Sequence, residues 1–138
     1  MTWFSTTAFS FELPGAWSEK SVQTHQAPGG RAALLVTREP RAKDAAPADL
    51  AKELSALPVP ADTEREILHD LRVEIGSLEG EDVALVRRSK QAAEYHRIVR
   101  VPYYELDLAF QGASRHEDRA LVDACMEEVL ATVRFRRR

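Results

Sequence analysis

Four histidines are the residues of this chain best suited to acid–base or metal chemistry: His25, His69, His96 and His116. No two of them stand at the close spacing that puts two ligands on one face of a strand or helix. His69 falls in the apolar register of an alternating segment, so we expect it to be a core or interface residue. We therefore expect no metal and no other cofactor.

Two short segments put carboxylates beside imidazoles, residues 94–96 and residues 116–118. Adjacent residues in a strand point to opposite faces of the sheet, and the second segment looks like the entry of a helix. Neither segment is predicted to be a catalytic pair. The only cysteine, Cys125, lies in an apolar helical stripe, where burial would leave its thiol unreactive. These residues favour a protein that is not an enzyme, with a histidine-dependent hydrolase as an alternative.

Phosphate-binding and nucleic-acid-binding motifs are also weak. Pro28-Gly29-Gly30 is followed by neither a Lys-Ser or Lys-Thr pair nor a helix, so it is predicted to be a hairpin turn. Neighbouring predicted strands carry a group of basic residues, which are Arg87, Arg88, Lys90, Arg97 and Arg100. Tyrosines lie nearby, as on some nucleic-acid-binding surfaces. Acidic residues lie among them, so cross-strand charge pairs on a solvated sheet face are the simpler interpretation.

The overall charge and the hydropathy of the chain also argue against nucleic-acid binding and membrane insertion. The net charge of -3 comes from 19 basic and 22 acidic residues, which would not steer the chain to nucleic acid or anionic lipid. The chain has no signal-peptide pattern and no apolar run of about 20 residues. One cysteine cannot form an internal disulfide, which suits a reducing compartment. We expect a cytosolic protein.

The length of 138 residues, with 44% of them apolar, suits one domain over residues 1–138. Alternating apolar residues predict strands at 9–11, 21–26, 32–37, 67–75, 83–88, 94–101 and 104–111, with a turn at 79–82. Apolar residues at helical spacing predict helices over 49–57 and 117–133. This order predicts an α+β fold with an antiparallel sheet and both helices packed on one face, so that Leu54 and Leu108 share a core.

The opening segment Phe9-Ser10-Phe11-Glu12-Leu13-Pro14-Gly15-Ala16-Trp17, with a strand near Val22 and then Ala33-Leu34-Leu35-Val36-Thr37-Arg38-Glu39, resembles the DcrB-like family. The later order of elements, closing on Val133-Arg134-Phe135, is similar to that family over nearly the whole chain. The resemblance implies the curved-sheet fold of the Mog1 and PsbP proteins.

Members of that family without a secretion signal include the Eag chaperones of type VI secretion, which resemble this chain in length and in their Phe-rich first strand. The resemblance implies a small, dimeric chaperone. It would hold the amphipathic or transmembrane helices near the amino terminus of a secreted effector until the effector is loaded.

If both helices cover one sheet face, strand alternation directs six side chains to the other face, where they could form a groove for a partner helix: Val22, Thr24, Leu35, Thr37, Val86 and Ile98. Arg88 and Arg100 would share that face. A dimer interface explains the same residues equally well. The sequence thus predicts a non-enzymatic effector chaperone or adaptor. A module of the same fold with another partner, such as an immunity or structural protein, is the alternative.

Overall fold

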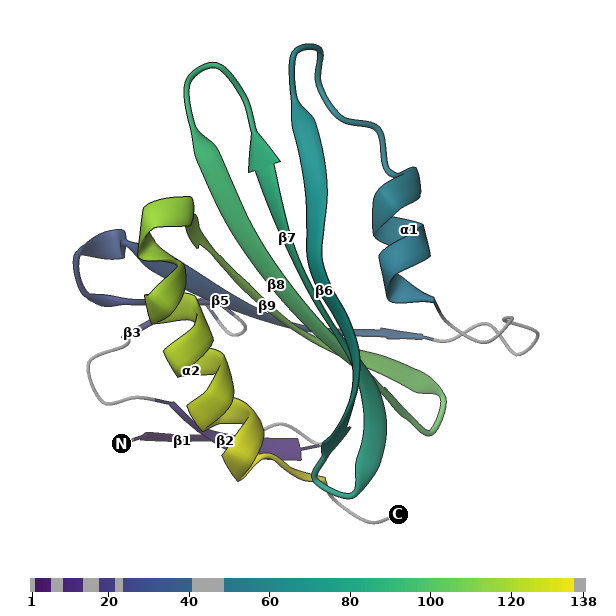
Figure 1. Ribbon diagram of the computed structural model, residues 1–138. Coiled ribbons are helices and arrows are strands. Elements are labelled where there is room, and N and C mark those ends of the chain that lie inside the picture. The colour runs from purple at the N-terminus through teal and green to yellow at the C-terminus, as the bar shows by residue number, and fades with distance from the viewer. Residues whose placement is uncertain (1, 6–8, 14–17, 22–23, 41–48, 136–138) are drawn as a thin grey trace.

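The computed structural model describes residues 2–5, 9–13, 18–21, 24–40 and 49–135 of the chain. Most of the strands form a strongly twisted antiparallel sheet of seven strands in the order β3-β4-β5-β9-β8-β7-β6 (Figure 1). A smaller sheet has the order β1-β2-β10. The strands are β1 (Thr2–Ser5), β2 (Phe9–Leu13), β3 (Ser18–Ser21), β4 (Thr24–Gln26), β5 (Ala32–Pro40), β6 (Glu64–Ile75), β7 (Leu78–Arg88), β8 (Ala93–Tyr103), β9 (Leu106–Arg115) and β10 (Arg134–Phe135).

Two α-helices accompany the sheets, α1 (Leu50–Ala56) and α2 (Arg119–Thr132). The predicted α+β class, the curved antiparallel sheet and both helices are confirmed. Within the described ranges, neither helix is long and apolar enough to cross a membrane.

The turn between β6 and β7 differs from the prediction. It lies at Gly76 and Ser77, which have φ of 52° and 76°, as a two-residue hairpin turn requires. The predicted turn at 79–82 is therefore wrong, and Glu81 and Asp82 are buried within β7. An acidic run is typical of a turn, but here each carboxylate is paired with an arginine of the neighbouring strand β8.

The main hydrophobic core lies between α2 and the large sheet. Its sheet side includes Leu108 and Phe110 of β9, and its helix side includes Met126 and Val129, all four fully buried. Gly112 of β9 lies directly under the helix, and a Cβ at that position would be 2.5 Å from Val122 Cγ1. The missing side chain lets α2 approach the sheet closely.

Helix α2 also connects the two sheets. It contacts β2 of the small sheet and β9 of the large one. The chain leaves α2 directly into β10, which pairs with β2 through Arg134 opposite Ser10 and Phe135 opposite Phe9. The small sheet is therefore attached to the end of the main core.

The two helices lie on opposite faces of the large sheet, which corrects the prediction that both pack on one face. Helix α1 contacts β6 and β7, and Glu53 pairs with Arg100 at 2.6 Å. Val99 and Val101, on either side of Arg100, belong to the α2 core, so strand alternation puts Arg100 and α1 on the other face. Leu54 consequently does not share a core with Leu108. The leucine spacing of α1 specifies an apolar stripe, but it does not specify which sheet face the stripe covers.

Candidate functional site

The face of the large sheet that lies opposite α2 carries most of the predicted binding residues. Thr24, Leu35, Gln111 and Ile98 follow one another in register across β4, β5, β9 and β8. Leu35 is 37% exposed, and the other three side chains are half-buried. Thr37 lies on the same face, in the row that continues through β9 to Arg100. We call this part of the sheet, over β4, β5, β9 and β8, the open face.

Two of the predicted residues are not placed there. Val86 is the register partner of Tyr95, on the α2 side of the sheet, and is fully buried. The β7 residue beside Ile98 is Val83, three positions earlier and therefore of opposite orientation. Alternation orders the residues of β7 among themselves, but only the pairing register of β7 with β8 sets which of them lies beside Ile98. Val22 lies outside the described residues.

Small side chains form much of the open face. Ala109 and Ala113 of β9 flank Gln111 on the same face, and Ala33 of β5 is opposite Ala113. All are half-buried. Small apolar side chains therefore surround Leu35 and Ile98, the two large aliphatic side chains of the face, with the polar Gln111 between them.

A charged cluster lies at the edge of the open face, on its border with α1. Arg100 Nη2 lies 2.6 Å from Glu53 Oε2 and 3.3 Å from Glu81 Oε2. Burial alone would lower the pKa of Arg100, but Glu53 and Glu81 outweigh it and raise the pKa, so the guanidinium stays charged. Its Nε is buried and has no hydrogen-bond partner among the described residues. Arg100, expected near the site, thus lies at its border with α1.

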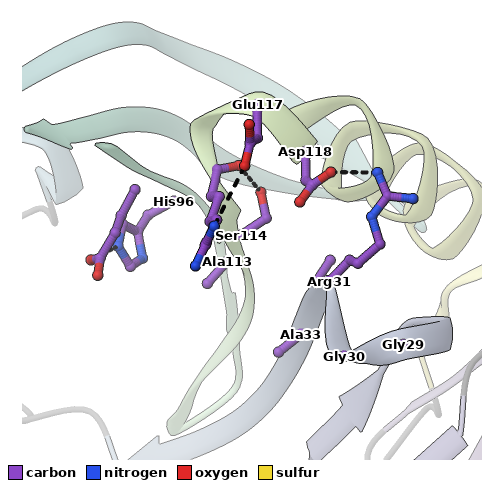
Figure 2. A pocket seen from close by; sticks show the side chains of 12 residues that line it. Gly29, Gly30, Arg31, Ala33, His96, Ala113, Ser114, Glu117 and Asp118 are labelled. Carbon is purple, nitrogen blue, oxygen red and sulfur yellow. Dashed lines mark hydrogen bonds and ion pairs between the residues drawn. The ribbon is translucent and has the colours of Figure 1, made fainter. Parts of the chain in front are cut away.

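At the opposite end, the open face runs into an open pocket of about 520 Å³, lined partly by Ala33 and Ala113 (Figure 2). Its rim carries Arg31, which pairs with Asp118 at 2.5 Å, and Arg115, which lies 3.7 Å from Glu117. The opposite charges at the rim offer no single-sign field for an anion or a cation.

His96 and Glu94 also line this pocket, with Nε2 and Oε2 3.4 Å apart. The expectation that this carboxylate and imidazole point apart is wrong, because residues two positions apart in a strand share a face. Hydrogen bonds from Arg87 and then from His96 lower the pKa of Glu94, despite some burial. Ser114 Oγ, the hydroxyl of the pocket, donates to the Arg115 carbonyl at 2.8 Å and not to an imidazole. This arrangement suits binding better than nucleophilic catalysis.

A second polar cluster lies on the α2 side of the sheet. Asp82 accepts two hydrogen bonds from Arg97, at 2.7 and 3.1 Å, and lies 3.0 Å from His69 Nε2. Asp123 of α2 accepts from Arg97 at 3.2 Å and from the Tyr95 hydroxyl at 2.6 Å. Sequence reasoning missed this cluster, because its members come from four separate elements.

The environment shifts several pKa values of that cluster. Burial alone would raise the pKa of Asp82, but hydrogen bonds from Arg97 and His69 lower it below its usual range. Burial first, and then the bond to Asp123, raise the pKa of Tyr95 far above its ordinary value. The cluster therefore holds fixed charges and a neutral phenol, which is typical of a structural network.

The basic residues are paired as predicted. Arg87 lies 2.6 Å from Glu94, and Arg88 lies 2.6 Å from Glu66. Arg97 and Arg100 are also paired, although they are half-buried and not solvated. The interpretation as charge pairs is confirmed for these four arginines.

The described ranges contain no candidate site for metal or thiol chemistry. No group of three or more His, Cys, Asp or Glu side chains is arranged there to hold a metal ion. Cys125 is buried as predicted, and burial, followed by the charge of Glu128, raises its thiol pKa to about 12. Such a thiol is not a nucleophile near neutral pH.

No protein-family model matches the chain, and no curated protein is significantly similar to it in sequence. Solved structures do match. Cyanobacterial PsbP (CyanoP) from Synechocystis sp. PCC 6803 has a TM-score of 0.66 at 10% identity, over 98% of this chain and 92% of that one. LpqN of Mycobacterium tuberculosis, described as involved in cell envelope biogenesis, has a TM-score of 0.65 at 10% identity, over 94% and 83%.

A protein from Bacteroides thetaiotaomicron VPI-5482 has a TM-score of 0.60 at 17% identity, over 94% of this chain but only 45% of that protein. Identities this low show the fold alone. The chain has a PsbP-like fold, which the resemblance in its sequence implied.

Proposed function

We propose that this chain is a non-enzymatic binding protein whose open face holds an apolar or amphipathic helix of another protein. One observation carries the proposal: Leu35 and Ile98 lie in one register row on either side of Gln111, with alanines in the neighbouring rows, on a face that α2 leaves uncovered. An exposed aliphatic surface of this kind marks a partner site in many proteins. A helix that lays its apolar stripe on it would remove both surfaces from water.

The resemblance to Eag chaperones makes the proposal more specific. In that reading, the partner is a helix near the amino terminus of a type VI secretion effector, and the chain acts in the cytosol as a homodimer. Two features of the chain support a binding role over catalysis: the pocket has no activated nucleophile in its described lining, and its Cys125 thiol is buried. A neighbouring gene for an effector with a PAAR spike domain and early transmembrane segments would support this specific role.

The direct test uses a synthetic amphipathic helix of about 20 residues, rich in leucine and alanine, with a fluorescent label and a glutamate in its first turn. Leu35→Asp and Ile98→Asp each place a charge on the open face. We expect each to weaken binding of this peptide at least about tenfold, which corresponds to about 1.4 kcal/mol. Leu71→Asp is the matched control, because Leu71 is 51% exposed on β6, on the other face.

Sedimentation analysis of the same variants separates partner binding from self-association. Weaker peptide binding with an unchanged oligomeric state supports the proposal. Dissociation to monomers would assign the open face to a dimer interface, and unchanged peptide binding would overturn the proposed site.

A further inference from the structure

The apolar patch under α1 is separate from the main core and continuous with the open face. Leu50, Val83 and Leu85 are each no more than 5% exposed, and none belongs to the core beneath α2. Val83 of β7 is the direct register partner of Ile98 on β8. The same face of the sheet therefore continues from the open face onto β7, where α1 covers it.

Helix α1 is a weakly held cover. It has seven residues, and Leu50 is its one buried residue. So short a helix is not stable by itself in water, and one buried leucine gives it little apolar anchoring. In Figure 1 it lies on the outer side of β6 and β7, away from α2 and the small sheet.

Polar contacts supply most of the remaining attachment. The Leu50 N–H donates to Glu81 Oε1 at 3.0 Å, and Arg65 donates to the carbonyls of Ser55 and Leu57 at 2.6 and 2.8 Å. Glu53 pairs with Arg100, but the side chain of Glu53 is 58% exposed. Water or another carboxylate can replace such a partner at small cost.

Arg100 is placed to serve a second carboxylate. It stands between α1 and the open face, in the register row that links Glu81 to Ala109. While α1 is in place, its Nε–H is buried and no described residue offers it an acceptor. Buried donors normally have a partner, so this one points to a contact that the free protein does not make.

We propose that α1 is a displaceable cover over a part of the helix-binding site that lies on β7, beside the open face. The free protein keeps α1 on Val83 and Leu85, which keeps that apolar surface from water. A partner helix that carries a glutamate in its first turn takes the place of α1, sets an aliphatic side chain where Leu50 was, and pairs with Arg100. The inference rests on the proposed function. It adds that the partner helix carries a carboxylate in its first turn and that the partner binds by displacing α1.

Hydrogen exchange with the synthetic peptide described above tests the displacement. On saturation of the unmodified protein with the peptide, we expect faster exchange of amides 50–57 and slower exchange in β8 and β9. A version of the peptide with glutamine in place of its first-turn glutamate is expected to bind about three- to tenfold more weakly.

Glu53→Gln removes the charged contact of α1 and should strengthen peptide binding about three- to tenfold, because displacing α1 then costs less. Glu66→Gln is the matched control, since Glu66 is a 58% exposed partner of Arg88 on the α2 side of the sheet, and it should change nothing. Peptide binding with amides 50–57 protected, or binding that Glu53→Gln leaves unchanged or weakens, would overturn the displacement and leave the proposed function standing. Failure of both the unmodified protein and Glu53→Gln to bind the peptide would overturn both.

Discussion

At the level of single residues, Asp82 is the charged group most dependent on the fold. Its side chain is 3% exposed, and it is held by Arg97 and His69. Two charges inside a protein are tolerated only while they remain together, because neither can regain its water. Arg97 also bonds to Asp123, so the network links β7 and β8 to α2.

Asp82→Asn should therefore destabilise the protein by about 3–5 kcal/mol at neutral pH, because it leaves the charge of Arg97 with one fewer carboxylate. Urea unfolding monitored by circular dichroism measures the loss. Glu117→Gln, which removes an exposed carboxylate, should cost less than about 0.5 kcal/mol. A loss below about 1 kcal/mol for Asp82→Asn would mean that the network contributes no net stability.

The same residue determines part of the acid stability. The pKa of Asp82 is lower in the folded chain than its unfolded value of about 3.9. Its stabilisation is thus complete above that value and is lost as the pH falls through the lower folded pKa. The difference in unfolding free energy between the unmodified protein and Asp82→Asn should narrow on acidification below about pH 4. An unchanged difference would contradict the assignment.

The Cys125 thiol supplies another prediction at this scale. With its pKa raised to about 12 by burial, it should not react with a thiol reagent such as DTNB at about pH 8 in the folded protein. It should react fully in denaturant. Rapid labelling under native conditions would show that α2 is not packed as described.

At the level of elements, the approach of α2 to β9 depends on Gly112. Alanine there would bring a methyl group within 2.5 Å of Val122 Cγ1, so the helix or the strand must shift. Gly112→Ala should cost about 1–3 kcal/mol in denaturant unfolding. A double-mutant cycle with Val122→Ala is the control. The double variant should lose less unfolding free energy than the sum of the two single losses, because Val122→Ala makes room for the added methyl group. Strict additivity would contradict the contact.

The placement of α1 shows the limits of pattern reasoning for an element. Its helical character follows from Leu50 and Leu54, and its N-cap from Asp49, whose side chain accepts from the Lys52 N–H at 3.1 Å. Its position over Val83 follows from Arg100 and Glu81, which are distant in sequence. Because α1 covers part of this sheet face, the uncovered area is smaller than it would be if both helices packed on the α2 side.

At the level of the whole molecule, the two sheets and α2 should unfold as one unit. Trp3 lies in β1, so in a Trp17→Phe variant tryptophan fluorescence reports on the small sheet, whereas the far-ultraviolet circular dichroism signal comes mostly from the large sheet. Because α2 contacts both sheets, neither can open without exposing its core. We expect coincident denaturation midpoints for the two signals. Two separate midpoints would contradict a single domain over residues 1–138.

The sequence by itself determined the class of the fold, the central strands, both helices and the burial of Cys125. These follow from local periodicity, which each segment carries within its own residues. It also predicted that Thr24, Leu35, Thr37 and Ile98 share a sheet face, because alternation within each strand is regular.

Only the tertiary structure decided the rest. It placed α1 opposite α2, turned Val86 into the core, put Glu81 and Asp82 inside β7, and brought Arg97 to Asp123. Each of these depends on a partner at least nine residues away in the sequence, on a neighbouring strand or helix. Local periodicity indicates that a side chain needs a covering or pairing group. The packing of elements distant in sequence decides which group that is.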